Sequence, residues 1–354
     1  MSSRILALSH KSQVNLTTPT ITRMYLLSLC ALAAVIHSSI TDGGASLLIA
    51  LSALLAALLT ESLTCIKTGR LTILDGSAAV SALVLTLLLP NTIHPSVAAV
   101  GAVFAIAVTK ISYGGLGGTW FNPAISALLF LRLSWGDVFK NALASSPLAV
   151  FSAGAAEGDG GSIGQAIEYL RQNGFETTSG GITSFMNNYP LKIFNVEYPA
   201  YYLDFFNAEY TGIIADRGIF ALVLGSLLLL TFGVSRYVYS AIYLGVLLIL
   251  AKIFGGFLSG GDFFSGDILF ALFSGGTLVA AFFLLCEPSS SPKTSGAKYI
   301  TAVLAAVLTF LFRYVQNEPY GAVYAIALIN MIVPVIRVIE SALFFEAKKE
   351  LPNA

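Results

Sequence analysis

Charge is scarce in this sequence, and that scarcity limits what the protein can be. Only 11% of the 354 residues are charged and 56% are hydrophobic, whereas about a quarter of the residues in an ordinary soluble domain are charged. A soluble protein of this composition could not cover its surface with polar groups, but a surface that faces lipid is allowed to be apolar. The 19 basic and 19 acidic residues give a net charge of zero, so the whole-chain charge says nothing about nucleic-acid or acidic partners. We expect no nucleic-acid partner.

Residue types that carry covalent or metal chemistry are also few. The three cysteines stand alone, and the three histidines have no carboxylate or cysteine partner at a useful spacing; these residues are Cys30, Cys65, Cys286, His10, His37 and His94. We therefore predict no disulfide framework, no zinc or other metal site and no protein-bound iron–sulfur cluster. The sequence contains no Ser-His-Asp arrangement and no phosphate-binding loop, so we predict no catalytic residue in this chain alone.

Long apolar runs are what the sequence has in abundance. They predict an all-α polytopic membrane protein with about ten transmembrane helices. The runs fall at residues 24–41, 44–65, 73–90, 95–110, 122–135, 218–235, 238–255, 267–286, 299–315 and 320–340.

The distribution of lysine and arginine predicts that both termini are cytoplasmic. In that orientation the short outside loops 42–43, 91–94 and 256–266 carry no basic residue. The segments expected inside carry Arg4, Lys11, Arg23, Lys67, Arg70, Lys110, Arg236, Lys293, Lys298, Arg337, Lys348 and Lys349.

One long polar stretch divides the apolar runs into two sets of five. Residues 156–217 are rich in charge, glycine, asparagine and tyrosine, and the expected topology makes them an extracytoplasmic insertion. The remaining parts are a cytoplasmic N-terminal segment (1–23), a first transmembrane half (24–155), a second half (218–340) and a cytoplasmic tail (341–354). Because each half has an odd number of spans, any repeat that relates them is inverted across the membrane. We predict such a 5+5 inverted repeat.

Two of the apolar runs open on an aspartate. The third opens with Asp75-Gly76-Ser77 and the eighth with Asp267, and Ser274-Gly275-Gly276 follows Asp267 by one to two turns. Each aspartate is explained either as a helix N-cap or as a polar contact to a cofactor or cation. The glycines allow another group to approach the backbone closely.

A glycine-rich segment precedes the fifth run. Gly114, Gly115 and Gly117 are followed by Phe121 and Asn122 at the start of the apolar run. Such a segment forms either a broken helix beside a bound ligand or an ion path, or a tight hairpin with close packing.

Taken in order, these motifs resemble one family of membrane proteins. It includes the D subunit of the Rnf complex and the B subunit of the sodium-pumping NADH:quinone reductase, and the length and short N-terminus are more similar to the former. The resemblance covers nearly the whole chain outside the insertion. It rests on Leu74-Asp75-Gly76-Ser77-Ala78, Gly114-Gly115-Leu116-Gly117, Phe121-Asn122-Pro123-Ala124, Gly266-Asp267-Ile268-Leu269-Phe270, Ser274-Gly275-Gly276, Glu287-Pro288, Glu318-Pro319-Tyr320-Gly321-Ala322 and the stretch from Asn330 to Pro334.

The resemblance implies that the chain carries two flavins. Family members hold an FMN whose phosphate is esterified to a threonine on the outer side, within a motif of small residues, and a modifying flavin transferase makes the bond. Here Ile182 falls at the position of that threonine, so Thr183 is the first candidate for attachment and Thr178 the second, with Ser179, Gly180 and Gly181 as the small neighbours. The second flavin is a non-covalent riboflavin among the helices. Its expected contacts are Asp75, Gly76, Ser77, Gly114, Gly115, Gly117, Phe121, Asn122, Ser274, Gly275 and Gly276.

The resemblance also implies a function. We expect a subunit of an ion-translocating ferredoxin:NAD oxidoreductase of the Rnf type, in the inner membrane of a prokaryotic cell, that passes electrons through flavins coupled to Na⁺ or H⁺ transport. Its partners would be the other membrane and peripheral subunits, the ion and the flavin transferase. Three alternatives remain open: the B subunit of the sodium-pumping reductase, a urea- or ammonium-type channel without flavin, and a scaffold protein without a cofactor.

Overall fold

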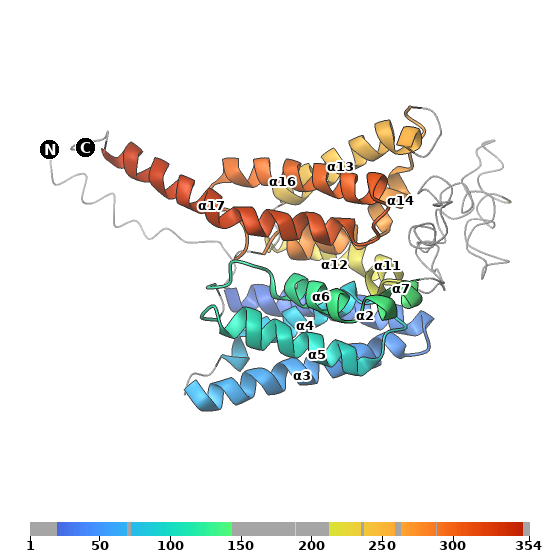
Figure 1. Ribbon diagram of the computed structural model, residues 1–354, viewed down its shortest axis with the longest axis vertical. Coiled ribbons are helices and arrows are strands. Elements are labelled where there is room, and N and C mark those ends of the chain that lie inside the picture. The colour runs from blue at the N-terminus through green and yellow to red at the C-terminus, as the bar shows by residue number, and fades with distance from the viewer. Residues whose placement is uncertain are drawn as a thin grey trace.

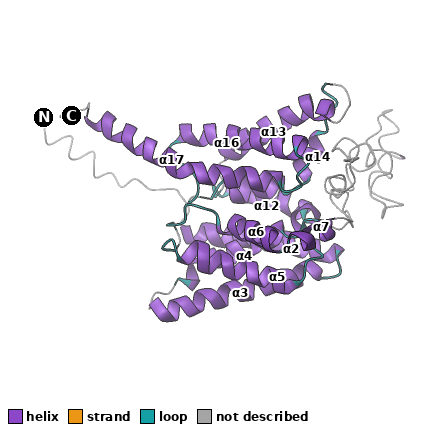
Figure 2. Ribbon diagram, in the orientation of Figure 1, coloured by secondary structure: helices purple, strands orange, loops and turns teal. Residues whose placement is uncertain are grey.

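The computed structural model of the chain describes residues 20–68, 72–115, 117–143, 212–234, 237–258, 263–287 and 289–349, together with Asn188. Regular structure in these residues is helical (Figure 2), and their only β-type contact is an isolated bridge between Pro90 and Ile213. Five helices are long and apolar enough to cross a membrane, at Thr20–Thr41, Ala45–Lys67, Val238–Leu258, Ser295–Val315 and Gly321–Ala342. The protein is therefore a polytopic helical membrane protein, as its composition predicts.

The first half of the chain forms a set of helices that lie side by side in the lower part of Figure 1. Each except α7 coincides with an apolar run found in the sequence. They are α2 (Thr20–Thr41), α3 (Ala45–Thr68), η1 (Ile73–Asp75), α4 (Ser77–Leu88), α5 (Pro95–Phe104), which continues as the π-helix η2 (Ala105–Ile111), α6 (Pro123–Ser134) and α7 (Gly136–Leu143).

The second half follows a similar order of elements. After the short α11 (Ile214–Arg217), it comprises α12 (Ile219–Thr231), α13 (Tyr237–Leu258), α14 (Ile268–Phe273), α15 (Thr277–Val279), the π-helix η6 (Ala280–Leu284), α16 (Ser295–Phe310), which continues as the π-helix η7 (Leu311–Val315), and α17 (Gly321–Lys349). The start of α2 and the end of α17 lie on the same side of the bundle (Figure 1).

One apolar run is not the single helix that the sequence predicts. Residues 267–286 are broken between α14 and α15, and the break falls at Ser274-Gly275-Gly276. Gly275 and Gly276 both have a φ of +65°, a conformation that glycine adopts without steric cost. Hydropathy cannot reveal such a break, because the flanking residues are apolar on both sides.

Capping side chains set several helix boundaries. The Asn122 side chain accepts hydrogen bonds from the backbone N–H groups of Ala124 and Ile125, and Pro123 occupies the first turn of α6. Thr294 caps α16 in a similar way. These are standard N-terminal signals, and the boundary at Asn122-Pro123 could be read from the sequence.

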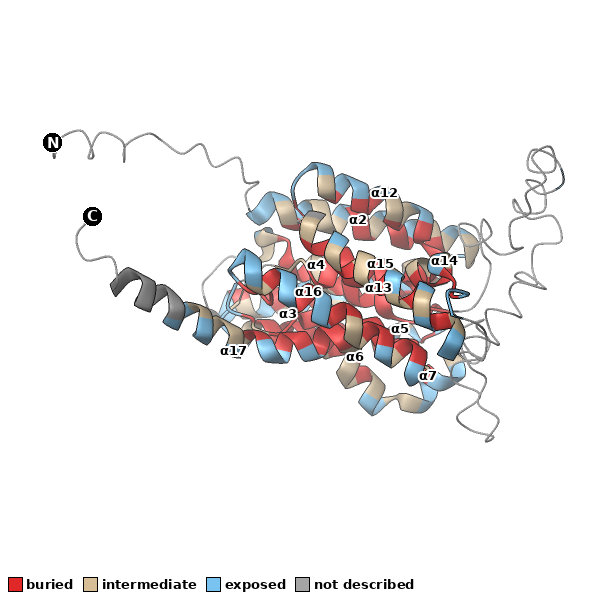
Figure 3. Cartoon of the chain, turned by 90° about the horizontal axis from the view of Figure 1, so that it is seen from above, coloured by how far each residue is buried: buried red, intermediate tan, exposed pale blue. Residues whose placement is uncertain are grey.

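The two halves meet closely along α2 and α12. A Cβ atom added at Gly225 would lie 3.0 Å from the Cβ of Cys30, and one at Gly218 would lie 2.6 Å from the carbonyl oxygen of Ala34. Small residues therefore bring the two backbones together, as is common between membrane helices. Buried residues face the interior of the bundle and exposed ones its outer sides (Figure 3). Many of the exposed residues are large and apolar, such as Ile66 and Leu133, which suits a lipid-facing surface.

Candidate functional site

A cleft lies between the two halves, near the end of the bundle at which α2 begins. Its volume is about 120 Å³. Its lining combines apolar and polar side chains from α2, α4, η2, the start of α6 and the loop before it, the residues after α12, and η6 with the segment that follows it. The apolar residues are Met24, Leu27, Val80, Val84, Pro123, Ala124, Val234, Phe282 and Phe283, and the polar ones are Thr20, Arg23, Ser77, Ser81, Lys110, Thr119, Asn122, Cys286 and Glu287.

A hydrogen bond joins the two halves across this cleft. The Asn122 Nδ2 group, from the first half, donates to Oε2 of Glu287 in the second half, while Asn122 Oδ1 caps α6. Glu287 also accepts hydrogen bonds from Ser289, at 2.8 Å, and Ser290, at 3.4 Å. Burial raises the pKa of Glu287, which lies beyond the end of η6, to about 7, although the bonds from Ser289, Ser290 and Asn122 act in the opposite direction.

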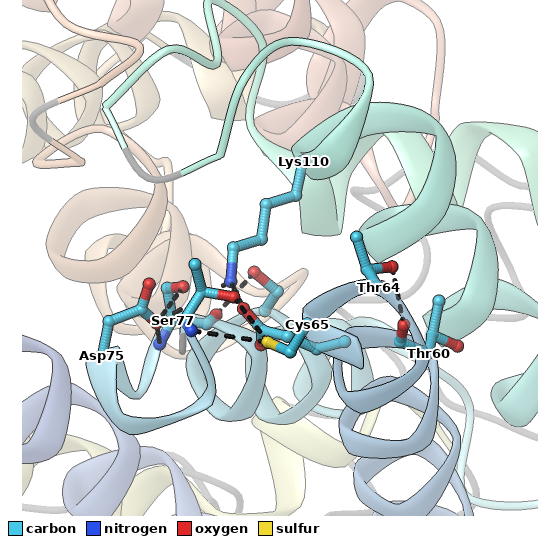
Figure 4. A network of polar contacts seen from close by, with 9 residues as sticks. Thr60, Thr64, Cys65, Asp75, Ser77 and Lys110 are labelled. Carbon is cyan, nitrogen blue, oxygen red and sulfur yellow. Dashed lines mark hydrogen bonds and ion pairs between the residues drawn. The ribbon is translucent and has the colours of Figure 1, made fainter. Parts of the chain in front are cut away.

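A buried ion-pair network stands beside the cleft (Figure 4). The Nζ group of Lys110 donates to Oε1 of Glu61 and lies 3.7 Å from Oδ1 of Asp75. Both Lys110 and Glu61 are almost fully buried, and Oε2 of Glu61 has no hydrogen-bond partner among the described residues. Such a pair is held by its own attraction, because either charge alone would be costly inside the protein.

Asp75 organises the start of α4. Its Oδ1 atom accepts hydrogen bonds from the Ser77 backbone N–H, at 2.8 Å, and from the Ser77 hydroxyl, at 2.5 Å. Gly76, between them, has a φ of +73°. Asp75 therefore fixes the first turn of α4 from the position before its N-cap, which is Gly76, and lies close to the ammonium group of Lys110.

A second polar cluster surrounds the break between α14 and α15. The two carboxylate oxygens of Asp216 accept hydrogen bonds from the N–H groups of Gly275 and Gly276, each at 2.8 Å. Successive N–H groups of this kind form an anion-binding concavity. Burial raises the pKa of Asp216 to about 6, and these two bonds and the charge of Arg313 oppose that shift. Asp267 caps α14 by accepting from the Phe270 N–H at 3.0 Å.

Arg313 completes this cluster from η7. Its guanidinium donates to the carbonyl oxygen of Ala271 at 2.9 Å, to the Thr277 hydroxyl at 2.7 Å and to the Ser274 hydroxyl at 2.6 Å. Lys110 lies in η2 and Arg313 in η7, and these π-helices end the fourth apolar run of the first and second half. In each half the cation lies against the third run: Lys110 is near Asp75, and Arg313 donates to Ser274 and Thr277. π-Helical segments often occur at functional sites.

The structure separates the predicted flavin contacts into three groups. Ser77 and Asn122 line the cleft, with Asp75 and Gly76 directly beside Ser77. Ser274, Gly275 and Gly276 belong to the second cluster instead. Gly114, Gly115 and Gly117 lie in a loop with φ between +88° and +94°, where a Cβ atom would meet no atom within 4 Å. Phe121 is buried against Trp120.

The attachment candidates cannot be placed in this way. Thr183, Thr178, Ser179, Gly180 and Gly181 lie outside the described residues, as does the predicted insertion up to residue 211 apart from Asn188.

Several polar residues at these sites were not predicted from the sequence. Glu61, Asp216 and Arg313 were not singled out, and Lys110 was counted as a loop charge although it is only 3% exposed. The sequence did contain a signal that could have identified them. A charged residue inside or beside an apolar run is costly to bury unless it has a polar partner, so each such residue implies a partner nearby.

The fold and the cleft define the class of the protein: an integral membrane protein of two helical halves, with polar side chains buried between and within them. The chain matches the NQR2, RnfD, RnfE family over residues 7–344 and belongs to that family. The resemblance seen in the sequence motifs is thus confirmed.

Similar proteins belong to ion-translocating complexes. The D subunit of the proton-translocating ferredoxin:NAD(+) oxidoreductase complex of Clostridium ljungdahlii is 29% identical over 314 residues, which cover 88% of each chain. The D subunit of the ion-translocating oxidoreductase complex of Aeromonas hydrophila is 29% identical, over 89% of this chain and 91% of its own. The D subunit of the Na(+)-translocating ferredoxin:NAD(+) oxidoreductase complex of Acetobacterium woodii is 28% identical, over 75% and 71%.

Proposed function

We propose that this chain is the flavin-carrying membrane subunit of an ion-translocating ferredoxin:NAD oxidoreductase of the Rnf type. The observation that carries the proposal is the cleft between the halves, lined by Ser77 and Asn122, in a chain whose relatives are named as the D subunits of such complexes. The other membrane and peripheral subunits of the complex would be its partners. The chain would not complete the reaction alone.

The cleft is where a non-covalent flavin, riboflavin, would bind. The chemistry of its lining suits a flat aromatic ring with one polar edge, because apolar side chains such as Phe282 and Val84 share it with Ser77, Asn122 and Glu287. At about 120 Å³ the cleft would enclose only part of the cofactor. A bound flavin supplies the redox chemistry, and the protein supplies position and electrostatics. Asn122 and Glu287 would orient the polar edge.

A covalent FMN would be attached on the extracytoplasmic side by a flavin transferase. Thr183 is the proposed site, because a hydroxyl is required for the phosphoester and Ile182 has none. After co-expression with the transferase, Thr183→Ala should abolish flavin fluorescence of the denatured chain in a gel, and Thr178→Ala, the matched control, should leave it intact. The reverse pattern would move the site to Thr178. Fluorescence that survives both changes would place it elsewhere.

We further propose ten spans arranged as a 5+5 inverted repeat, with the insertion 156–217 outside and both termini cytoplasmic. The similar order of elements in the two halves supports this arrangement. The two helices that follow an aspartate also support it. α4 begins on the side of the bundle where α2 begins and α17 ends, whereas α14 begins on the opposite side (Figure 1). Cysteines introduced at Lys192 and at Lys293, which is exposed on the expected cytoplasmic side whereas Lys298 is buried, should react with an impermeant maleimide from opposite faces. Reaction of both from one face would refute the topology.

The transported ion is an open choice between Na⁺ and H⁺, since the relatives' names include both. The B subunit of the sodium-pumping quinone reductase remains the nearest alternative within the family. A chain that holds no flavin at all would favour a channel or a scaffold on the same helical frame.

A further inference from the structure

Three consecutive serines beside the cleft are buried although they lie outside any helix. Ser289, Ser290 and Ser291 are 7%, 2% and 7% exposed. The hydroxyls of Ser289 and Ser290 donate to the Glu287 carboxylate, one to each oxygen. The position of Glu287 in the cleft therefore depends on where this irregular segment, residues 289–294, is held.

Two charged side chains of α17 hold that segment. One NH₂ group of Arg337 donates to the carbonyl oxygens of Ser289 and Ser291, the latter at 2.7 Å. The Glu340 carboxylate accepts from the backbone N–H groups of Lys293, at 3.2 Å, and Thr294, at 2.9 Å, and from the Thr294 hydroxyl. Arg337 and Glu340 are three residues apart, so they project from the same side of the helix.

These contacts connect α17 to a cleft that α17 itself does not line. Ser289 is bound on two sides, through its hydroxyl to Glu287 and through its carbonyl to Arg337. From Glu287 the connection continues to Asn122 and the start of α6. Bonds that involve a charged partner are stronger than neutral ones, and a segment without helical or sheet hydrogen bonds depends on them for its position.

We propose that Arg337 and Glu340 are positioning residues that clamp residues 289–294 to α17 and thereby hold Glu287 in the cleft against Asn122. The role rests on the proposed function, in which Glu287 faces the non-covalent flavin. Arg337 and Glu340 do not touch that site. Their removal should loosen the cleft while leaving the covalent FMN in the insertion in place.

The test uses Arg337→Gln, with Val338→Ala as the matched control. Val338 is the next residue of α17 and is 67% exposed. The first readout is the rate at which Cys286, which lines the cleft, reacts with a small maleimide. It is measured in a Cys30→Ala, Cys65→Ser background within the assembled complex. The second readout is the flavin released by acid, compared with the flavin that stays with the precipitated chain.

Arg337→Gln should raise the rate of Cys286 modification about tenfold, the change expected when charge-assisted hydrogen bonds are lost. It should also lower the acid-released flavin and leave the covalent flavin and the melting temperature close to those of the control. Arg337→Lys, which keeps the positive charge and one donor nitrogen but loses the planar guanidinium, should fall between. If Arg337→Gln does not fold, Glu340→Gln is measured with the same two readouts and is expected to change them in the same directions.

An unchanged Cys286 rate together with unchanged acid-released flavin would overturn the clamp. Equal effects in the Val338→Ala control would also overturn it, because they would show a general loss of stability. If the wild-type complex releases no flavin but Arg337→Gln still exposes Cys286, the clamp stands and the proposed flavin site fails.

Discussion

Replacing Gly275 by alanine should destabilise the protein more than the same change at Gly276, its neighbour. Both residues have a φ of +65°, so both substitutions carry the backbone strain of a non-glycine residue in the left-handed region, about 1–2 kcal/mol. The difference lies in the space for the new methyl group. At Gly275 it would lie 2.8 Å from the carbonyl oxygen of Pro319 and 3.3 Å from Cζ of Arg313, whereas at Gly276 the nearest atom is Cδ2 of Leu88 at 3.7 Å.

The clash at Gly275 adds an overpacking cost of about 1–3 kcal/mol, because the nearest atom belongs to the backbone and cannot rotate away. We therefore expect a loss of about 3 kcal/mol for Gly275→Ala and about 1.5 kcal/mol for Gly276→Ala. Both losses are measured as changes in the free energy of unfolding, in mixed micelles of a mild and a denaturing detergent. Equal losses, or a larger loss at Gly276, would show that the packing of the α14–α15 break is not as described.

Two further changes probe the cleft and its neighbouring ion pair. Burial raises the pKa of Glu287 to about 7 from the ordinary value of 4.5, so between those pH values the folded protein binds a proton that the unfolded chain releases. Wild-type stability should accordingly fall as the pH rises from 4.5 to 7, and Glu287→Gln should flatten this dependence in micelle unfolding; an unaltered slope would contradict the burial argument. Glu61→Gln should cost roughly 3–5 kcal/mol, because among the described residues it leaves buried Lys110 with Asp75, at 3.7 Å, as its remaining charged partner. Glu61→Leu combined with Lys110→Met should be far less damaging in melting-temperature measurements, and a double variant as unstable as Glu61→Gln would argue against an ion pair.

The helices could be predicted from the sequence because lipid imposes a simple rule on them. A span must be apolar over its whole length, and the runs that start near residues 95, 122 and 238 became α5, α6 and α13 almost at the expected boundaries. The start of α6 was marked further by Asn122-Pro123. The role of Asp267 as the N-cap of α14 was also accessible, since an aspartate before an apolar run is a local signal.

The long-range polar contacts could not be predicted in the same way. Asn122 and Glu287 are separated by 165 residues, and Lys110 and Glu61 by 49. No local pattern states which charged residue of one run meets which of another. Lys110 was counted only as a charge on the expected cytoplasmic side for this reason, because at the end of an apolar run a buried partnered lysine and a solvated one have the same sequence context.

The central claim is that this chain carries flavin in two chemically distinct ways, and acid extraction tests it most directly. The complex, purified after co-expression with the flavin transferase, is precipitated with trichloroacetic acid, and each fraction is analysed for flavin by chromatography and fluorescence. We predict riboflavin in the supernatant, reduced by Ser77→Leu, a change that fills the cleft. We also predict esterified FMN in the pellet on this chain, unaffected by the same change. A chain with no flavin in either fraction would contradict the account.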